Sequence, residues 1–289
     1  MVAVDGMKSD NEFGREAAAS EFLCGRVLVC VPHMDDAVVG CGGVLAAAAD
    51  KSSVRLVYCT DGRGTVRPDE RDAVRGTESD IGLIRMRETR KALNVLGYKP
   101  DQAEFLGHKE WKLADSSCEL CDYLSAVITD FSPDVILVPS RYDKHCDHLT
   151  LNRELRRAVE QTCSTADIFE YFVYYQWKLL PSGDIRDYIK PELLVAADIE
   201  AVSNRKRQAL DCFESQTTVY YDWQHKPVLS EELLKRFADG PEVFMKVNAG
   251  ARDRDVLRIS PLIVRTLNRL EPFLKNTKEK ILSIKHCKF

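Results

Sequence analysis

A short apolar run, Val27–Val31, constrains the fold of this chain more than any other stretch. It is continuous rather than alternating, as expected for a parallel strand that is buried on both faces. His33, Asp35 and Asp36 follow it almost directly. Open α/β sheets bind their ligands at the carboxyl ends of strands, so the run would deliver one imidazole and two carboxylates to such a position. Burying three such groups is costly unless something pairs them, and a divalent metal ion would do so.

The same stretch also has a simpler interpretation as a strand followed by a polar loop and a helix. Aspartate is common at helix starts because it caps the backbone and complements the helix dipole. The glycine-rich stretch 40–43 would then form a turn before an alanine-rich helix over 42–50. On these residues alone the two hypotheses are equally good.

Further apolar runs alternate with segments of helical periodicity. Strands are predicted at 54–59, 104–106, 134–139, 168–175 and 193–197, and helices at 81–96, 118–129, 149–159 and 199–214. This alternation predicts an α/β, Rossmann-like fold with a mostly parallel sheet that helices cover on both faces. From residue 222 the pattern becomes irregular, and we expect a long loop over 63–80 at the carboxyl edge of the sheet.

Composition excludes several classes of protein. The net charge of −4 over 289 residues does not suggest a nucleic-acid-binding protein, and no apolar run reaches the length of a membrane span. The first twenty residues contain no apolar signal core. Ten cysteines in a chain of this length do not form a disulfide framework, and the lone CxxC pair, Cys118 and Cys121, has no second pair with which to bind zinc. We therefore expect a reducing, cytoplasmic location.

The C-terminal segment 252–289 is basic, with ten Lys and Arg residues against four acidic residues. Its apolar residues give a partly helical pattern: Ile259, Leu262, Ile263, Leu267, Leu270 and Phe273. One hypothesis is an amphipathic element that docks on an anionic membrane or polyanion. The hypothesis that we favour is a helix that packs on the domain, or on a second subunit of a homo-oligomer, with a solvated basic face.

A second polar cluster follows a second buried strand. The apolar run 134–139 leads into residues 140–148, which include His145, Asp147 and His148, and a helix follows. Because two parallel strands of one sheet can be neighbours, the ends of the runs at 27–31 and 134–139 could lie side by side.

In that arrangement His33 and Asp36 could meet His148. Two imidazoles and one carboxylate, with positions open for water, suit catalytic zinc, and the same set suits iron(II). Adjacent aspartates point in different directions, so Asp35 could accept a proton from the attacking water. His145 could donate to an oxyanion or to a leaving group. Together these residues would suit hydrolysis of an amide.

The combined pattern resembles the LmbE-like, or PIG-L-like, zinc-dependent de-N-acetylases. The matching segments are Pro32-His33-Met34-Asp35-Asp36-Ala37, Thr60-Asp61-Gly62, Arg85 with Glu88, His145-Cys146-Asp147-His148 and Ser215-Gln216. The resemblance covers about residues 25–250. It leaves a mobile N-terminal arm or short capping helix over 1–24 and a basic, partly helical extension over 251–289.

The resemblance implies a Rossmann-like deacetylase domain with zinc on His33, Asp36 and His148. It also implies that Asp35 is the general base and that His145 stabilises the tetrahedral intermediate. Two further roles come with it: Asp147 would orient a histidine, and Arg85 would contact substrate. Without the resemblance, the spacing of Arg85 and Glu88 favours a surface ion pair. Family substrates are mostly N-acetylglucosamine conjugates, from which acetate is released to leave a free amine.

Two positions depart from the family pattern and keep alternatives open. Met34 replaces the usual proline, and Val38 stands where many members have an acid, so the groups around the expected metal ligands differ from the family pattern. One alternative is therefore a non-catalytic relative that binds metal and sugar. A second is a metallophosphoesterase, although that chemistry usually needs more ligands. A third is a nucleotide-binding domain that uses Gly40–Gly43 as a phosphate loop, without a GxGxxG or GKS/GKT motif.

Overall fold

The computed structural model describes residues 15–64, 80–221, 224–268 and 270. These residues form an eight-stranded sheet in the order β1-β7-β8-β6-β5-β2-β3-β4. The strands are β1 (Arg15–Ala18), β2 (Arg26–Val31), β3 (Ser53–Thr60), β4 (Ala103–His108), β5 (Val135–Pro139), β6 (Asp167–Tyr171), β7 (Leu194–Asp198) and β8 (Glu242–Val247). The helices are α1 (Ala19–Phe22), α2 (Asp36–Ala48), α3 (Ile81–Leu96), α4 (Ser117–Phe131), α5 (Cys146–Gln161), α6 (Ser203–Asp211), α7 (Glu214–Thr217), α8 (Glu231–Ala238) and α9 (Asp253–Val256).

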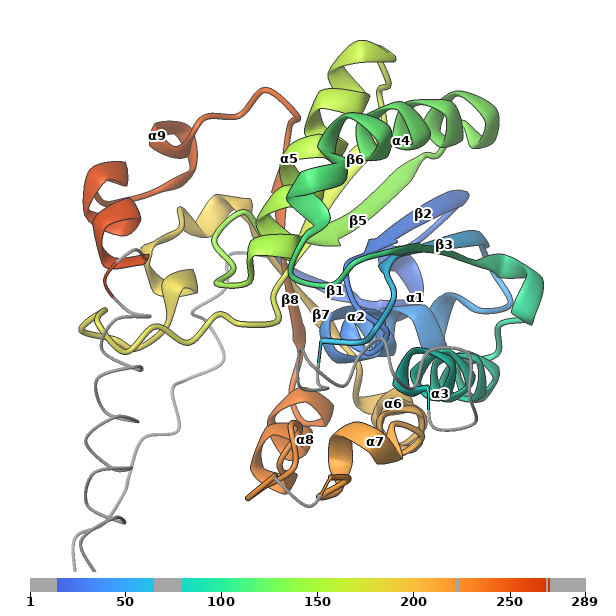
Figure 1. The fold of residues 1–289 in the computed structure, drawn as a ribbon. Coiled ribbons are helices and arrows are strands. Elements are labelled where there is room, and N and C mark those ends of the chain that lie inside the picture. Colours follow the sequence, from blue (N-terminus) through green and yellow to red (C-terminus); the bar gives the residue numbers. More distant parts are fainter. Residues whose placement is uncertain (1–14, 65–79, 222–223, 269, 271–289) are drawn as a thin grey trace, which may run out of the picture.

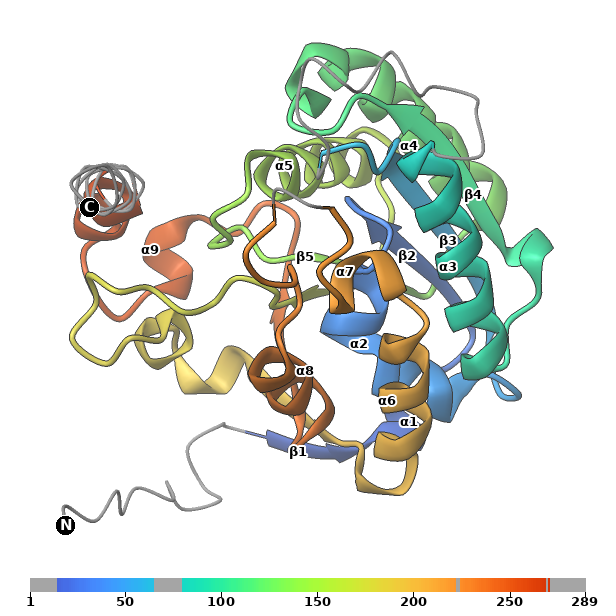
Figure 2. The ribbon, with the colours of Figure 1, turned by 60° about the horizontal axis from the view of Figure 1, so that its bottom comes forward.

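Helices cover both faces of the sheet, as Figures 1 and 2 show. On one face, α1, α2, α3, α6 and α8 pack against one another and bury one core cluster with the sheet. On the other face, α4 and α5 pack together over a second cluster. The predicted fold class is therefore confirmed. None of the helices that the structure describes is long and apolar enough to cross a membrane.

The order in which strands are added to the sheet reverses at its centre. From β2 the chain proceeds through β3 and β4 to one side, and it then crosses back to β5 and β6 on the other side. β2 and β5 are parallel neighbours, with Val27 opposite Val135 and Val29 opposite Leu137. Their carboxyl ends therefore lie side by side at a topological switch point, where open α/β sheets bind ligands.

Strand β8 is the main element that the sequence pattern missed. It pairs antiparallel with both β6 and β7, and so lies inside the sheet rather than at its edge. The expectation of irregular chain after residue 222 is wrong for this segment, because β8 and α8 are both regular. A strand buried between two neighbours carries a short apolar run, and a run of that length is ambiguous without its tertiary partners.

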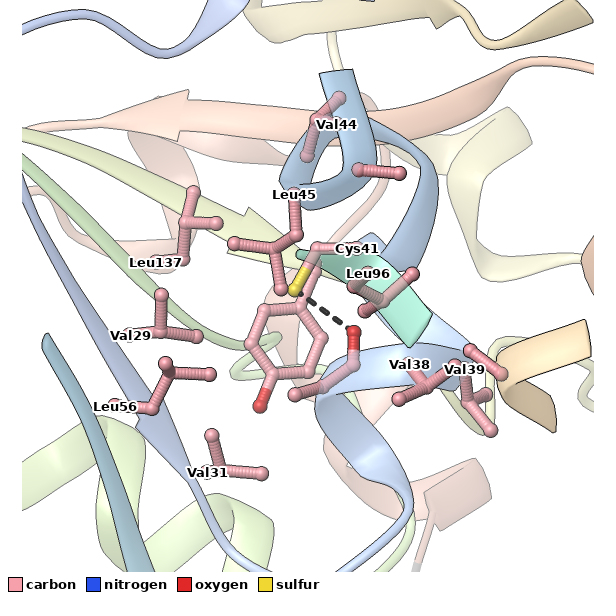
Figure 3. Packing of buried hydrophobic residues seen from close by; sticks show 14 of the residues in the cluster. Val29, Val31, Val38, Val39, Cys41, Val44, Leu45, Leu56, Leu96 and Leu137 are labelled. Atoms are coloured by element: carbon pink, nitrogen blue, oxygen red, sulfur yellow. Dashed lines mark hydrogen bonds between the residues drawn. The ribbon is translucent and has the colours of Figure 1, made fainter. Parts of the chain in front are cut away.

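Helix α2 begins at Asp36 and includes the glycines that were expected to form a turn. Cys41 departs from helical geometry, with φ of −147°, and its thiol donates to the Ala37 carbonyl at 3.1 Å among the buried side chains of Figure 3. A Cβ at Gly40 would lie 2.4 Å from Tyr171 Cδ2, and one at Gly43 would lie 2.5 Å from Ile199 Cγ2. The glycines therefore serve close packing, and the break expected at this place is a kink inside α2 at Cys41 rather than a separate turn.

A buried ion pair stabilises the second part of α2. The Glu242 carboxylate accepts hydrogen bonds from the backbone N–H groups of Gly43 and Val44, at 2.6 and 2.9 Å. It also accepts one from Lys206 Nζ at 2.7 Å. These are the N–H groups that a phosphate loop would present to a ligand. The phosphate-loop hypothesis for Gly40–Gly43 is therefore wrong.

Both predicted extensions contribute to the folded domain where the structure describes them. Residues 15–18 pair with β7 as strand β1, so the predicted arm is in fact part of the sheet over this stretch. At the other end, residues 261–268 are helical and Val264 is buried in the second core cluster. Leu262 and Ile263 are exposed. Residues 1–14 and 271–289, which include Phe273, lie outside the described part of the chain.

Replacing Gly40 with alanine tests the packing of α2. The new Cβ would force Tyr171 to move, although the Tyr171 hydroxyl donates to the Cys30 carbonyl at 3.0 Å. We expect the free energy of unfolding to fall by about 1–2 kcal/mol, after the gain in helix propensity is included. Urea denaturation followed by circular dichroism measures the change. Gly250→Ala is the control, because its Cβ would meet nothing closer than Glu160 Oε1 at 3.7 Å; equal effects of the two variants would contradict this account.

Candidate metal centre

The switch point brings together the polar residues that follow β2 and β5. His33 lies in the turn after β2, and Asp36 is the first residue of α2. The turn closes locally, because the His33 backbone N–H donates to Asp36 Oδ2 at 3.0 Å. His148 lies in the first turn of α5, whose N-cap is His145. Helix α5 therefore begins earlier than predicted and carries His148 as part of a regular turn.

Three side-chain atoms converge here within hydrogen-bond distance of one another. Asp36 Oδ2 lies 2.9 Å from His33 Nδ1 and 3.0 Å from His148 Nε2. The two ring nitrogens lie 3.1 Å apart. Tetrahedral zinc, with bonds of about 2.0–2.1 Å, needs ligand atoms about 3.3 Å apart. The three atoms therefore fit a metal ion closely, and all three side chains are almost fully buried.

A carboxylate stands behind each of the two histidines. His148 Nδ1 lies 3.1 Å from Asp143 Oδ2, and His33 Nε2 lies 3.3 Å from Asp147 Oδ2. Carboxylates of this kind fix the tautomer and orientation of metal-binding histidines. The position of Asp147 supports the orienting role expected from the resemblance. Asp143 was not singled out from the sequence, although its place two residues before His145 was a signal that could have found it.

Neighbouring charges in this cluster shift the pKa values of His148 and Asp36. Burial acts to lower the pKa of His148, but Asp143 and Asp36 outweigh it and raise this pKa to about 9. Burial acts to raise the pKa of Asp36, but His148 and His33 hold it well below its usual range. The cluster therefore favours an anionic Asp36 facing positive charge, and a metal cation supplies such charge while leaving both imidazoles neutral.

His145 differs from the other two histidines because it stays neutral. Burial, followed by the neighbouring His33 and His148, lowers its pKa to about 4. Its Nδ1 accepts a hydrogen bond from the Asp147 backbone N–H at 3.2 Å. In the neutral ring the proton must then lie on Nε2, so His145 is preset as a hydrogen-bond donor.

Asp35 lies beside the convergent atoms but bonds in another direction. Its Oδ1 accepts a hydrogen bond from Arg85 Nη2 at 2.9 Å. Arg85 also donates to the Gly62 carbonyl at 3.0 Å and to Glu110 Oε2 at 3.3 Å. Burial raises the pKa of Asp35, while Arg85 acts to lower it. Glu110, whose Oε1 lies 4.0 Å from His33 Nε2, is a second acid that the sequence analysis did not identify.

Arg85 and Glu88 do not form the surface ion pair that their spacing alone favoured, since both are buried. Glu88 instead accepts hydrogen bonds from the backbone N–H and the hydroxyl of Ser215, at 2.8 and 2.7 Å. The helix motif and the late Ser-Gln pair of the sequence are thus joined in space. This contact holds α3 against α7, and it thereby positions Arg85 toward Asp35.

The two departures from the family pattern lie outside the convergent set. The Met34 side chain is buried, and its carbonyl accepts a hydrogen bond from Thr89 Oγ1 at 3.0 Å, which holds the turn that proline would otherwise stiffen. Val38 is fully buried in the first core cluster. Neither residue disturbs the approach of His33, Asp36 and His148.

Two other groupings of possible ligand atoms among the described residues include His145. His33, His145 and His148 form one group whose possible ligand atoms all lie within 4.8 Å of one another. His145, Cys146 and Asp147 form a second group that meets the same limit. Among His33, Asp36 and His148 the separations are 2.9–3.1 Å. This set contains the three ligands expected from the resemblance.

Comparison with known proteins finds similarity to a family model and to a curated protein. A family model described as "PIG-L: GlcNAc-PI de-N-acetylase" matches residues 28–159. A 1D-myo-inositol 2-acetamido-2-deoxy-alpha-D-glucopyranoside deacetylase of Rhodococcus jostii (strain RHA1) is 24% identical over 276 residues, which span 80% of this chain and 94% of that protein.

Two solved structures share the fold. N,N'-diacetylchitobiose deacetylase from Pyrococcus horikoshii is 19% identical with a TM-score of 0.56, over 78% of this chain and 84% of that chain. A triple mutant of a deacetylase from the teicoplanin biosynthetic pathway is also 19% identical, with a TM-score of 0.58, over 76% of this chain and 97% of that chain. At these identities the likeness establishes the fold.

Replacing Asp143 with asparagine tests whether this carboxylate supports a metal ligand. The amide would keep the shape of the side chain but lose the charge behind His148, so we expect zinc affinity to fall about 10- to 100-fold. A competition titration against a chelator measures the affinity. Asp167→Asn is the control, because Asp167 is an exposed carboxylate paired with Lys246 at the surface. An unchanged affinity in Asp143→Asn would contradict the supporting role.

Proposed function

We propose that this chain, which carries a PIG-L family domain over residues 28–159, is a metal-dependent hydrolase that removes an acetyl group from an N-acetylated sugar. The observation that carries the proposal is the convergence of His33, Asp36 and His148, with Asp143 and Asp147 behind the two rings. The Rhodococcus relative and the two structural relatives are all named as deacetylases, which supports the same reaction. We expect the substrate to be an N-acetylglucosamine-type conjugate.

His33, Asp36 and His148 would hold the metal ion. Two imidazoles and one carboxylate with positions left open are typical of catalytic zinc, and iron(II) is the alternative. When bound, such an ion supplies Lewis-acid chemistry, since it polarises the acetamide carbonyl and acidifies water. Burial of the three side chains keeps bulk water away from the reacting groups.

Asp35 would act as the general base. It follows the metal-binding turn directly, yet its carboxylate is held by Arg85 rather than by the histidines. Water adds to the carbonyl carbon of the acetamide, and Asp35 accepts the proton that this water loses. The C–N bond then breaks, and Asp35 returns the proton to the departing nitrogen. The products are acetate and a free amine.

His145 would stabilise the negative charge that develops on the carbonyl oxygen. Its Nδ1 is occupied by the Asp147 backbone N–H, so its Nε2–H is the group available to donate. A donor that is fixed before the reaction contributes most to catalysis, because it needs no reorganisation. The charge on Arg85 would have two uses: it favours the ionised form of Asp35, and it contacts substrate.

The remaining alternatives have less support in the structure. A metallophosphoesterase would need ligands for a second ion, and Asp143 and Asp147 are already engaged with the histidines and with backbone N–H groups. A non-catalytic relative would be expected to lose the base or the donor, but Asp35 and His145 are both present and positioned.

We also propose that the protein works in a reducing compartment such as the cytoplasm. The cysteines that the structure describes are free thiols. Three of them, Cys30, Cys41 and Cys59, are fully buried in the two cores, where they act as small apolar side chains.

Substitution of the base and of a ligand should separate hydrolysis from metal binding. We expect Asp35→Ala to keep about one metal ion per chain but to lose about 10²- to 10⁴-fold in rate, as removal of a general base does. His148→Ala should lose both the metal and the activity. Metal analysis combined with an amine-release assay on N-acetylglucosamine conjugates measures the two properties. Hydrolysis by Asp35→Ala at the wild-type rate would rule out the base assignment.

The pH dependence tests the contact between Arg85 and Asp35. Because Arg85 acts to lower the pKa of Asp35, its removal should raise that pKa. The base is active when ionised, so the acid limb of kcat in Arg85→Met should move to higher pH, by about 1–3 units. Arg85→Lys keeps the charge and should move the limb less. A profile for Arg85→Met that overlays the wild type would show that Asp35 is not the group that titrates.

A further inference from the structure

Two exposed aromatic side chains beside the metal centre have no part in the proposed chemistry. Trp111 is 52% exposed and Tyr174 is 45% exposed. Trp177, by contrast, is fully buried in a core. Large aromatic side chains left open next to a reaction centre are typical of surfaces that bind a ligand.

Trp111 is held next to the reacting groups by an unusual backbone. Its ring centroid lies 4.0 Å from that of His145, whose own ring lies 4.4 Å from that of His33. Its φ is 70°, in the left-handed region that is unfavourable for a tryptophan. Its backbone N–H donates to Asp147 Oδ2 at 2.7 Å, and this contact holds the residue in place. Strain that is retained at a functional site often serves to position a group.

Tyr174, which follows strand β6, is anchored by a similar contact. Its backbone N–H donates to Asp143 Oδ2 at 3.1 Å. Its ring centroid lies 5.5 Å from that of His148 and 6.4 Å from that of His145. The two carboxylates that stand behind the metal-site histidines therefore also fix the two exposed aromatic residues. The position of each ring is coupled directly to the geometry of the reaction centre.

We propose that Trp111 and Tyr174 form an aromatic subsite for a second pyranose ring, attached to the N-acetyl sugar that is hydrolysed. The C–H face of a pyranose is apolar and packs on a flat aromatic surface, while its hydroxyl groups stay solvated at the rim. The preferred substrate is then a disaccharide or longer glycoconjugate rather than free N-acetylglucosamine. This inference rests on the proposed function, because it assumes that the acetamide lies at the metal centre.

A binding experiment tests the subsite without requiring turnover. Calorimetric titrations of N-acetylglucosamine and of N,N'-diacetylchitobiose into the zinc-loaded Asp35→Asn protein give two dissociation constants. We expect the disaccharide to bind about tenfold more tightly than the single sugar, a difference of about 1.4 kcal/mol. Amine release by the wild-type protein is measured separately, so failure of the proposed function is distinguished from failure of the subsite.

Substitutions of Trp111 in the Asp35→Asn background then locate the effect. Trp111→Gly removes the ring but suits the φ of 70°, so the backbone contact to Asp147 and the thermal unfolding midpoint should persist. We expect this variant to lose the tenfold preference, whereas Trp111→Phe should keep most of it. Leu262→Ala, on the C-terminal helix and 72% exposed in the parent, controls for loss of an exposed apolar side chain.

Three results would overturn the proposal. The first is equal binding of the two sugars by the parent protein, and the second is an undiminished preference in Trp111→Gly. The third concerns the chemistry of the second ring. If binding of p-nitrophenyl N-acetyl-β-glucosaminide depends on Trp111 more strongly than binding of the disaccharide does, the subsite recognises an arene rather than a pyranose.

Discussion

The contact between Asp36 and two histidines is the interaction on which the rest of the site depends. One carboxylate oxygen lies within 3.0 Å of a nitrogen from each ring, although His33 and His148 are 115 residues apart in the sequence. Such a contact requires β2 and β5 to be neighbours and to end at the same level. The order of the central strands meets this requirement, and the elements packed around it keep the two strand ends in register.

Carboxylates of one chemical type take different parts in this centre because their partners differ. Asp36 faces two imidazoles, and its pKa is held low. Asp143 and Asp147 each support one histidine and one exposed aromatic residue. Asp35 faces Arg85, and its burial raises its pKa, which suits a group that must exchange a proton. Under the proposed function, the environment divides the roles of ligand, support and base among side chains that the sequence alone cannot rank.

Local patterns in the sequence predicted most of the regular elements and the residues of the candidate site. The helix over 81–96 and the strands that carry the candidate site residues agree with the structure, because hydrophobic periodicity is a local property. The turn expected at Gly40–Gly43 is instead a kink inside α2 at Cys41, and close packing explains the glycines on either side of it. Strand β8 was missed because only its pairing with β6 and β7 distinguishes it from irregular chain.

The sequence by itself determined the residue types, their order behind two buried strands and the fold class. It could not determine which side chains meet, since contacts between residues a hundred positions apart depend on strand order and register. Only the tertiary structure decided that Asp143 stands behind His148, that Glu88 bonds Ser215 rather than Arg85, and that Trp111 lies beside His145. The physical reason is that a side chain's partners and pKa follow from burial and proximity, which arise when the sheet and its helices assemble.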